Sequence, residues 1–430
     1  MACARDRLED ILGRLEARKS DERVFTKLYA EAARAAADAA DARRKAGVTL
    51  GPLDGAVVSI KDLFDVVGEP TLAGSFMRRN AAPATTDAAI VARLRRAGAI
   101  ILGKTAMTEF AFTAIGDNPH TGTPGNAADP ARIPGGSSSG AGVSAAEGTS
   151  DIAIGSDTAG SVRIPAALNG VVGFKPTARR VPLAGAFPLS PSLDSIGPLA
   201  RTVAECAAAD AVMSGMDPQP LKPLSLSGLR LGIPRGVLFR DMEAEVEAAF
   251  ENAISRLGAA GPRIEDIAIE DLLAAMRDTS LHATIPTMEG AEIHADWLDS
   301  GASLSVDPHV SGPLSRAASI PAPVYIRALR RRGELAAALD ERLSGFDALL
   351  LPTVPILAPQ IAEMADEKVR DHAEGLLLRN TRIANEFDLC AITLPLQGSA
   401  LPVGLMLIGR SGCDRRLLAM AATAEEILQA

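Results

Sequence analysis

The stretch PGGSSSGAGVSAAEGTSDIAIGSDTAGSVRIP, residues 134–165, is the most distinctive part of this sequence. It begins with paired glycines and a run of three serines, and near its end a second serine, Ser161, follows another glycine. Residues this small let a backbone approach a ligand or another backbone closely. Gly/Ser-rich segments are usually flexible linkers. Here the neighbouring segments 151–154 and 171–174 are apolar, which indicates core strands alternating with turns rather than a linker.

Two short motifs near this stretch match known signatures but lack the required context. Residues 136–140 satisfy G-x-S-x-G, yet that nucleophile elbow follows an apolar strand, and residues 126–134 (NAADPARIP) are typical of a turn. Residues 98–105 match G-x-x-x-x-G-K-[ST]. A phosphate-binding loop needs small, flexible residues between its glycines, whereas residues 99–102 form an apolar run typical of a strand. We assign no function to either match.

Composition and charge exclude several classes of function. The chain has 430 residues, a length compatible with one large α/β unit, and 47% of them are hydrophobic, which supplies a large core. The net charge of −9 argues against nucleic-acid binding, which needs a basic surface. The cysteines are widely spaced without C-x-x-C, and the histidines are scattered without H-E-x-x-H. The sequence therefore implies no metal and no cofactor.

The sequence contains no recognisable targeting or membrane segment. Its first residues, MACARDRLEDIL, are charged from the fifth position and lack the apolar region of a signal peptide. No run of about 18 apolar residues occurs. We expect a soluble cytoplasmic protein that binds no membrane.

The hydrophobic pattern predicts an α/β fold. Apolar residues recur at three- and four-residue steps near the start of the chain, which predicts that residues 1–50 form a helical segment. An amphipathic helix predicted at 87–97 is followed by a strand at 100–102. Residues 272–343 look mostly helical with proline breaks, and we expect them to form a substrate-side wall. We expect residues 1–430 to form a single domain.

Lys61 ends a strongly apolar strand predicted at 56–60. A lysine at a strand end usually extends its ammonium group into solvent. It can instead lie in a low-dielectric site, where the neutral amine is favoured and can act as a base. Lys104 and Lys175 are the rival lysines, but each falls in a predicted turn and we interpret both as structural. A serine nucleophile needs such a base, because no histidine lies in these motifs.

The chain resembles the amidase signature family of serine amidohydrolases. The resemblance rests on Lys61 in VSIKDLFDV, on GGSSSG at 135–140 and on GSDTAGSVRIPA at 155–166. It extends over residues 51–428 through these segments: GPLDGAVVSIKD, RRAGAIILGKTAMTEFAF, GVVGFKPT, SLDSIGPLART, FDALLLPTVPILAP and LPVGLMLIG. The resemblance implies a central mixed β-sheet with helices on both faces.

The resemblance also implies a covalent mechanism and assigns its catalytic roles to individual residues of this chain. Ser161 would attack the amide carbonyl, and Ser137, joined to Gly136 by a cis peptide bond, would connect it to neutral Lys61 as the general base. The backbone amides of Thr158, Ala159 and Gly160, together with that of Ser161, would form the oxyanion hole. A tight turn of small residues aims several amides at one point, where they stabilise developing negative charge. Ala159 departs from the glycine common in relatives.

The motif also carries a charged pair, Asp157 and Arg163. Each could brace the loop or contact the substrate, and we favour the brace because buried charges normally need partners.

Several segments resemble the branch of the family that acts on small ureido or carboxylated amides. They include DLCAITLP, LPVGLML and the tyrosine at 325 with its trailing arginines. A substrate carboxylate needs a cation, ideally a forked arginine. Our candidate substrate contacts are Ser138, Tyr325, Arg327 and Arg330.

These observations favour an amidohydrolase that cleaves a small-molecule amide. The alternative within the family is the A-type glutaminase component of a tRNA-dependent amidotransferase, which would require a partner chain. The third hypothesis is a non-catalytic relative, and the presence of all three catalytic side chains argues against it. The resemblance also suggests a homodimer.

Overall fold

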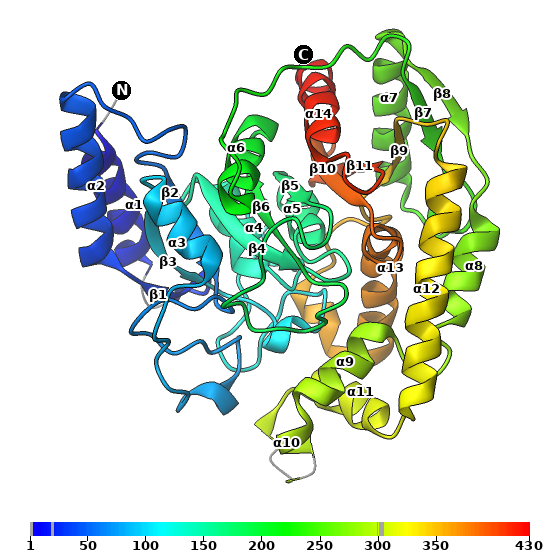
Figure 1. The fold of residues 1–430 in the computed structure, drawn as a ribbon, viewed down its shortest axis with the longest axis horizontal. Coiled ribbons are helices and arrows are strands. Elements are labelled where there is room, and N and C mark those ends of the chain that lie inside the picture. Colours follow the sequence, from blue (N-terminus) through cyan, green and yellow to red (C-terminus); the bar gives the residue numbers. More distant parts are fainter. Residues whose placement is uncertain (1–2, 19–20, 299, 301–304) are drawn as a thin grey trace.

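The computed structural model describes residues 3–18, 21–298, 300 and 305–430, which are built around one twisted mixed sheet (Figure 1). Within these residues the sheet has 11 strands. Their spatial order is β1 (Phe25–Leu28), β3 (Ile100–Thr105), β2 (Val57–Lys61), β4 (Ile152–Asp157), β6 (Ser195–Ala200), β5 (Val172–Lys175), β10 (Cys390–Leu396), β11 (Val403–Gly409), β9 (Ala348–Pro352), β7 (Arg230–Ile233) and β8 (Arg263–Asp266). The strands β3, β2 and β4 run parallel, as do β9, β7 and β8, while the pairs between β4 and β9 are antiparallel.

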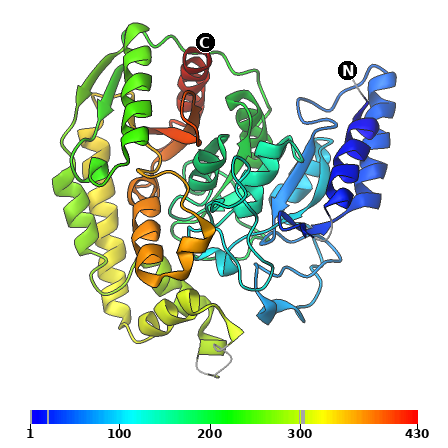
Figure 2. The same ribbon diagram turned by 180° about the vertical axis from the view of Figure 1, so that it is seen from behind.

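Helices cover both faces of the sheet, as the two opposite views show (Figures 1 and 2). One face carries α3 (Ala89–Arg96), α6 (Val203–Ser214), α7 (Ala244–Ala259) and α14 (Asp414–Gln429). The other carries α1 (Ala4–Ala17), α2 (Ala30–Lys45), α4 (Ser139–Glu147), α5 (Arg163–Asn169), α8 (Glu270–Asp278), α12 (Ala322–Arg342) and α13 (Glu367–Glu386). The helices α9 (Ile285–Ile293), α10 (Ala295–Leu298) and α11 (Pro308–Ala318) lie together at the lower edge in Figure 1.

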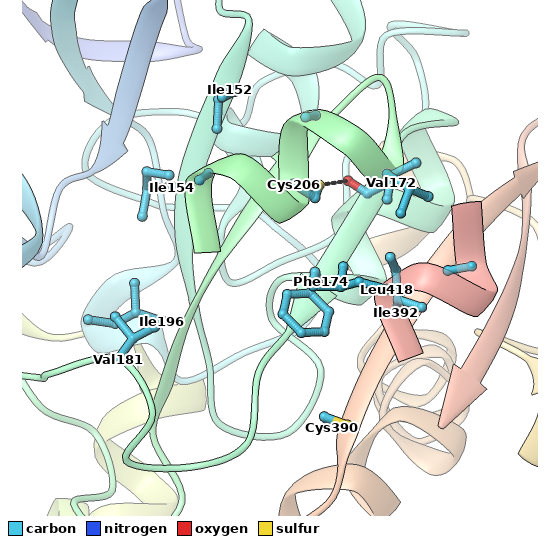
Figure 3. Close-up of a cluster of buried hydrophobic side chains, with 14 of the residues drawn as sticks. Ile152, Ile154, Val172, Phe174, Val181, Ile196, Cys206, Cys390, Ile392 and Leu418 are labelled. Carbon is cyan, nitrogen blue, oxygen red and sulfur yellow. Dashed lines mark hydrogen bonds between the residues drawn. The ribbon is translucent and has the colours of Figure 1, made fainter. Parts of the chain in front are cut away.

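The sheet divides the core because successive side chains of a strand point to opposite faces. In β2, Val57 packs with α1 and α2, whereas its neighbour Val58 packs in the cluster that contains α3 and α6. Figure 3 shows part of this second cluster, where Cys206 of α6 lies over β5 with its Sγ atom 3.8 Å from the Val172 carbonyl oxygen. Each large apolar side chain buried here contributes about 1.5–3 kcal/mol. Both faces of the central strands are therefore buried under helices, and polar groups at the strand ends are shielded from solvent.

The fold confirms the predicted α/β class, and the structure adds elements that the sequence pattern did not reveal, including the short helix α5. The strand β1 interrupts the helices expected over residues 1–50 and pairs with β3. The strand β8 has no fully buried residue and so no apolar signature. The helix α13 buries Asn380, Thr381 and Asn385 on its inner side, which breaks the apolar periodicity that identifies a helix.

The region at 272–343 contains helices α9 to α12 and most of α8, as expected, apart from residues 299 and 301–304, which lie outside the described part. Across the described residues, the structure holds no helix that is both long and apolar enough to cross a membrane.

Candidate active site

Lys61, at the end of β2, places its ammonium nitrogen against two serine hydroxyls. Its Nζ atom lies 2.7 Å from Ser137 Oγ and 2.8 Å from Ser156 Oγ. The side chain is fully buried, so the solvent-extended alternative is excluded. The strand β2 lies between β3 and β4, which brings the end of β2 beside the end of β4, where Ser156 lies.

Burial lowers the pKa of Lys61 to about 7, and the charges of Asp194 and Asp157 oppose this shift. The direction follows from the cost of placing an ammonium ion in a low-dielectric interior. A substantial fraction of Lys61 is therefore the neutral amine near pH 7, the form that can accept a proton.

The two rival lysines occupy structural positions. Lys104 lies in β3 and pairs with Asp62 at 3.4 Å, and Lys175 lies in β5 and donates to the Pro176 carbonyl oxygen at 2.7 Å. Both residues therefore lie in strands rather than in the predicted turns. Because each already has its own partner, the structural interpretation holds for both.

The serine-rich loop before α4 supplies Ser137 and Ser138. The peptide bond between Gly136 and Ser137 is cis, as the family resemblance implies. The Ser138 amide donates to the Ser161 carbonyl oxygen at 3.3 Å, and its hydroxyl donates to the Ser156 carbonyl oxygen at 3.2 Å. Ser138 is fully buried and ties the serine-rich loop to the segment that carries Ser161.

A buried ion pair holds the segment around Ser161. Arg163 donates to both carboxylate oxygens of Asp157, at 2.9 and 3.0 Å, and both side chains are inaccessible to solvent. Burial would raise the pKa of Asp157, but Arg163 and further donors bring it down to about 2. Asp157 also accepts the amides of Gly160 and Val162, at 2.8 and 3.1 Å. The structure therefore supports the brace interpretation of this pair.

The geometry of the segment distinguishes among the predicted oxyanion-hole amides. Gly160 has φ = 140°, a conformation that L-residues rarely adopt, and its amide already donates to Asp157. The amide of Gly160 is therefore occupied in this structure. The amides of Thr158, Ala159 and Ser161 are the remaining donors of the predicted set.

A cavity of about 470 Å³ opens beside Ser161, whose side chain is slightly exposed to it. Its walls come from the loop at 111–114, the segment that carries Ser161, the start of α9, and the helices α11 and α13. The lining residues are Ala111, Phe112, Thr113, Ala114, Thr158, Ala159, Ser161, Leu189, Leu193, Thr284, Pro286, Thr287, Pro308, His309, Pro313, Arg316, Glu367, Arg370, Asp371, Glu374, Leu378, Arg382 and Glu386.

The predicted substrate contacts on α12 lie away from this cavity. The Tyr325 hydroxyl donates to Glu289 Oε1 at 2.5 Å, and Tyr325 lines a separate cavity of about 640 Å³. Arg327 and Arg330 are exposed on the same helix. The structure thus does not bring these three residues to Ser161, and Ser138 is likewise absent from the lining.

Two site residues escaped the sequence analysis. Ser156 accepts a hydrogen bond from Lys61, and Asp194 accepts from the Thr158 hydroxyl at 2.6 Å and from the amides of Leu189 and Ser190. Burial raises the pKa of Asp194 to about 6. Both residues lie within the quoted motifs GSDTAGSVRIPA and SLDSIGPLART. The local sequence identified these segments but could not show that Ser156 contacts Lys61 or that the charge of Asp194 acts on it.

The described residues hold no group of three or more His, Cys, Asp or Glu side chains that could bind a metal ion. What the site does hold is a set of hydroxyl, amine and amide groups gathered around Lys61 and Ser161. A buried amine next to a serine hydroxyl, with a second serine at a cavity, is an arrangement in which an amine can activate a serine nucleophile without a histidine.

The comparison with protein families identifies the class more closely. The family model described as Amidase matches residues 6–418, and the chain belongs to this family, the amidase signature hydrolases that act on amide C–N bonds. The chain is 39% identical to 2-amino-5-chloromuconic acid deaminase of Comamonas testosteroni, over 92% of this chain and 86% of the relative.

Two further relatives cover most of the chain. The chain is 36% identical to the AtzE subunit of 1-carboxybiuret hydrolase from Pseudomonas sp. (strain ADP), over 94% of this chain and 91% of that protein. It is 34% identical to the A-type subunit of the glutamyl-tRNA(Gln) amidotransferase of Anaeromyxobacter dehalogenans, over 97% of this chain and 92% of that subunit. A crystal structure of an amidase superposes with a TM-score of 0.87 at 33% identity, covering 99% of this chain and 96% of that one.

Proposed function

We propose that this amidase cleaves the amide bond of a small molecule through a covalent acyl-enzyme on Ser161. Ser161 Oγ attacks the carbonyl carbon while its proton passes through Ser137 to the neutral amine of Lys61. The C–N bond then breaks, the proton moves to the leaving nitrogen, and an ester to Ser161 remains. Water repeats the sequence and releases the carboxylic acid.

One observation carries this proposal: the fully buried Lys61 lies 2.7 Å from Ser137 Oγ, with its pKa lowered to about 7. General-base catalysis is most effective when the pKa of the base lies near the working pH. The amides of Thr158, Ala159 and Ser161 supply the oxyanion hole in this proposal, and amides fixed in a dry site stabilise the developing charge. The brace of Asp157 and Arg163 keeps the turn in place.

We further propose that the substrate carries a carboxylate. The names of two relatives, a deaminase of an aminochloromuconic acid and a hydrolase of carboxybiuret, support this substrate class. Three arginines in the cavity wall support it as well: Arg316, Arg370 and Arg382.

The mechanism is tested by intact mass after treatment with a fluorophosphonate. Wild type is expected to gain one adduct, and Ser161→Ala none. Ser344→Ala, which removes an exposed hydroxyl, is the matched control and is expected to label like wild type. An adduct on Ser161→Ala would assign the nucleophile to another residue, and the absence of an adduct on wild type would contradict an activated serine.

The glutaminase alternative is less well supported, because the amidotransferase subunits are less similar to the chain than the deaminase is. Purified chain that hydrolyses small amides without a preference for glutamine would exclude it. The cytoplasmic location and the homodimer stay predictions, and light scattering on the purified protein measures the oligomeric state.

A further inference from the structure

The helix α13 presents one stripe of side chains to the cavity beside Ser161. Glu374, Leu378, Arg382 and Glu386 all line this cavity and follow one another at four-residue steps. Residues four apart lie one above the other on the same face of a helix. The stripe therefore runs along the cavity wall as acid, apolar, base, acid.

The three arginines of the cavity differ in their partners. Arg370 makes a bidentate pair with Asp117, at 2.6 and 3.0 Å. Arg316 is exposed. Arg382 is partly buried, and its Nε donates to the Leu378 carbonyl oxygen of its own helix at 3.2 Å. Throughout the described ranges, no carboxylate lies within 4.0 Å of the Arg382 guanidinium, so its terminal nitrogens are available to a ligand.

In the described residues the acidic groups nearby form no ion pair with Arg382 within 4.0 Å, although the charge of Arg382 acts on Glu386. Glu374 accepts the Ala114 amide at 2.7 Å. Glu386 attracts Arg382 only at longer range, and Glu367 and Asp371 are exposed. A partly buried guanidinium without an ion-pair partner in a cavity wall is a site for an anion, because its planar fork matches a carboxylate.

Arg382 is held close to the reacting serine by its neighbours on α13. The Thr381 hydroxyl donates to the Ala159 carbonyl oxygen at 2.7 Å, and the Thr381 carbonyl oxygen accepts from Arg163 at 2.6 Å. One turn further on, the Asn385 amide donates to the Asp157 side chain at 3.0 Å. The side chain of Arg382 therefore starts beside the segment that carries Ser161.

We propose that Arg382 is the specificity-determining residue of this amidase and binds a carboxylate of the substrate, with Leu378 contacting the short apolar spacer between this carboxylate and the scissile amide. The proposal rests on the proposed function. It selects half-amides of dicarboxylic acids, whose anion can bind Arg382 while the amide carbonyl lies at Ser161 in the same cavity.

The test compares malonamate and succinamate with neutral isosteres in which an isopropyl group replaces the carboxylate. Wild type is expected to hydrolyse at least one half-amide with a kcat/KM about 10- to 100-fold above that of its neutral partner, the range of a charge-assisted hydrogen bond. Arg382→Met keeps much of the apolar stem and should lose this preference on the half-amide while its kcat/KM on the neutral amide changes less than about threefold. Arg382→Lys should retain part of the preference.

Fluorophosphonate labelling separates the two proposals, because that probe carries no carboxylate. Arg382→Met should label Ser161 at the wild-type rate and melt at the wild-type temperature. The control Arg331→Leu removes an exposed arginine of α12 that pairs with Glu334, and it should leave both substrates unaffected. A wild type that labels but prefers the neutral amide, or hydrolyses no half-amide, overturns the role of Arg382 without affecting the acyl-enzyme. Equal losses on both substrates in Arg382→Met also overturn it.

Discussion

The rate at which Ser161 is acylated should follow the neutral fraction of Lys61, so lowering the pH is a direct perturbation of the base. The pKa of Lys61 is lowered to about 7 by burial, so about half of the enzyme has the neutral amine at pH 7. At pH 5 this fraction is about 1%. Acylation should therefore slow by about 50-fold between pH 7 and pH 5, and rise only about twofold from pH 7 to pH 9.

The assay is the second-order rate of fluorophosphonate labelling, followed by intact mass from pH 5 to pH 9. Other buried acids titrate in this window, since burial raises the pKa of Asp194 to about 6 and that of Glu374 to about 7. Glu374→Gln removes the second of these and should leave the midpoint of the profile unchanged. Lys61→Arg, which stays charged throughout, should label very slowly at every pH. A labelling rate that is flat from pH 5 to pH 9, or one that still rises about tenfold per pH unit at pH 9 as an ordinary lysine requires, would refute the reasoning.

Two further predictions concern stability. Burial of Lys61 lowers its pKa from 10.5 to about 7. Below pH 7 the buried ammonium group therefore lowers the free energy of unfolding by up to about 5 kcal/mol. Its hydrogen bonds to Ser137 and Ser156 offset this loss by about 1 kcal/mol each. The unfolded chain binds the extra proton between these values, so Lys61→Met should melt above wild type at pH 6–7. The difference should shrink as the pH rises and reverse above about pH 9, where the two lost hydrogen bonds outweigh the remaining cost of burial. Arg163→Met should lower the free energy of unfolding by about 3–5 kcal/mol in urea titrations, because it leaves Asp157 buried without its cation.

Melting temperatures and urea titrations can contradict the perturbation of Lys61 by burial and the bracing role of Arg163. Equal melting temperatures of wild type and Lys61→Met at pH 6 would mean that Lys61 is not perturbed by burial. The control for the ion pair is Arg342→Met, which breaks an exposed pair with Asp271 and should cost less than about 1 kcal/mol. A cost for Arg163→Met as small as that of this control would contradict a bracing role.

Most of the central sheet was predictable because its strands are short apolar runs bounded by turns. The predicted strands at 56–60, 100–102 and 151–154 correspond to β2, β3 and β4. The strand β1 was missed because only one of its four residues is buried, and it is recognised only by its pairing with β3. A short edge strand carries too little alternation to stand out from the helices around it.

The substrate side of the site was much less predictable. Sequence reasoning placed the cation for a substrate on α12, where Arg327 and Arg330 prove to be exposed. The cavity wall is instead formed by α13, whose inward side carries amides and a hydroxyl that bond to the segment around Ser161. Such a helix has no clear apolar stripe, since its inner side mixes hydrogen-bonding residues with the apolar residues that pack in the core.

The sequence by itself determined the α/β class, the family, and the segments that carry Lys61, Ser137 and Ser161, because strand patterns and tight turns of small residues are local properties. Only the tertiary structure decided that Lys61 is buried, that Asp157 is occupied by Arg163 and Gly160, and which arginines line the cavity. The physical reason is that a pKa and a binding site depend on the dielectric and the partners around a group. Those partners come from residues far apart in the chain, and only the closed fold brings them together.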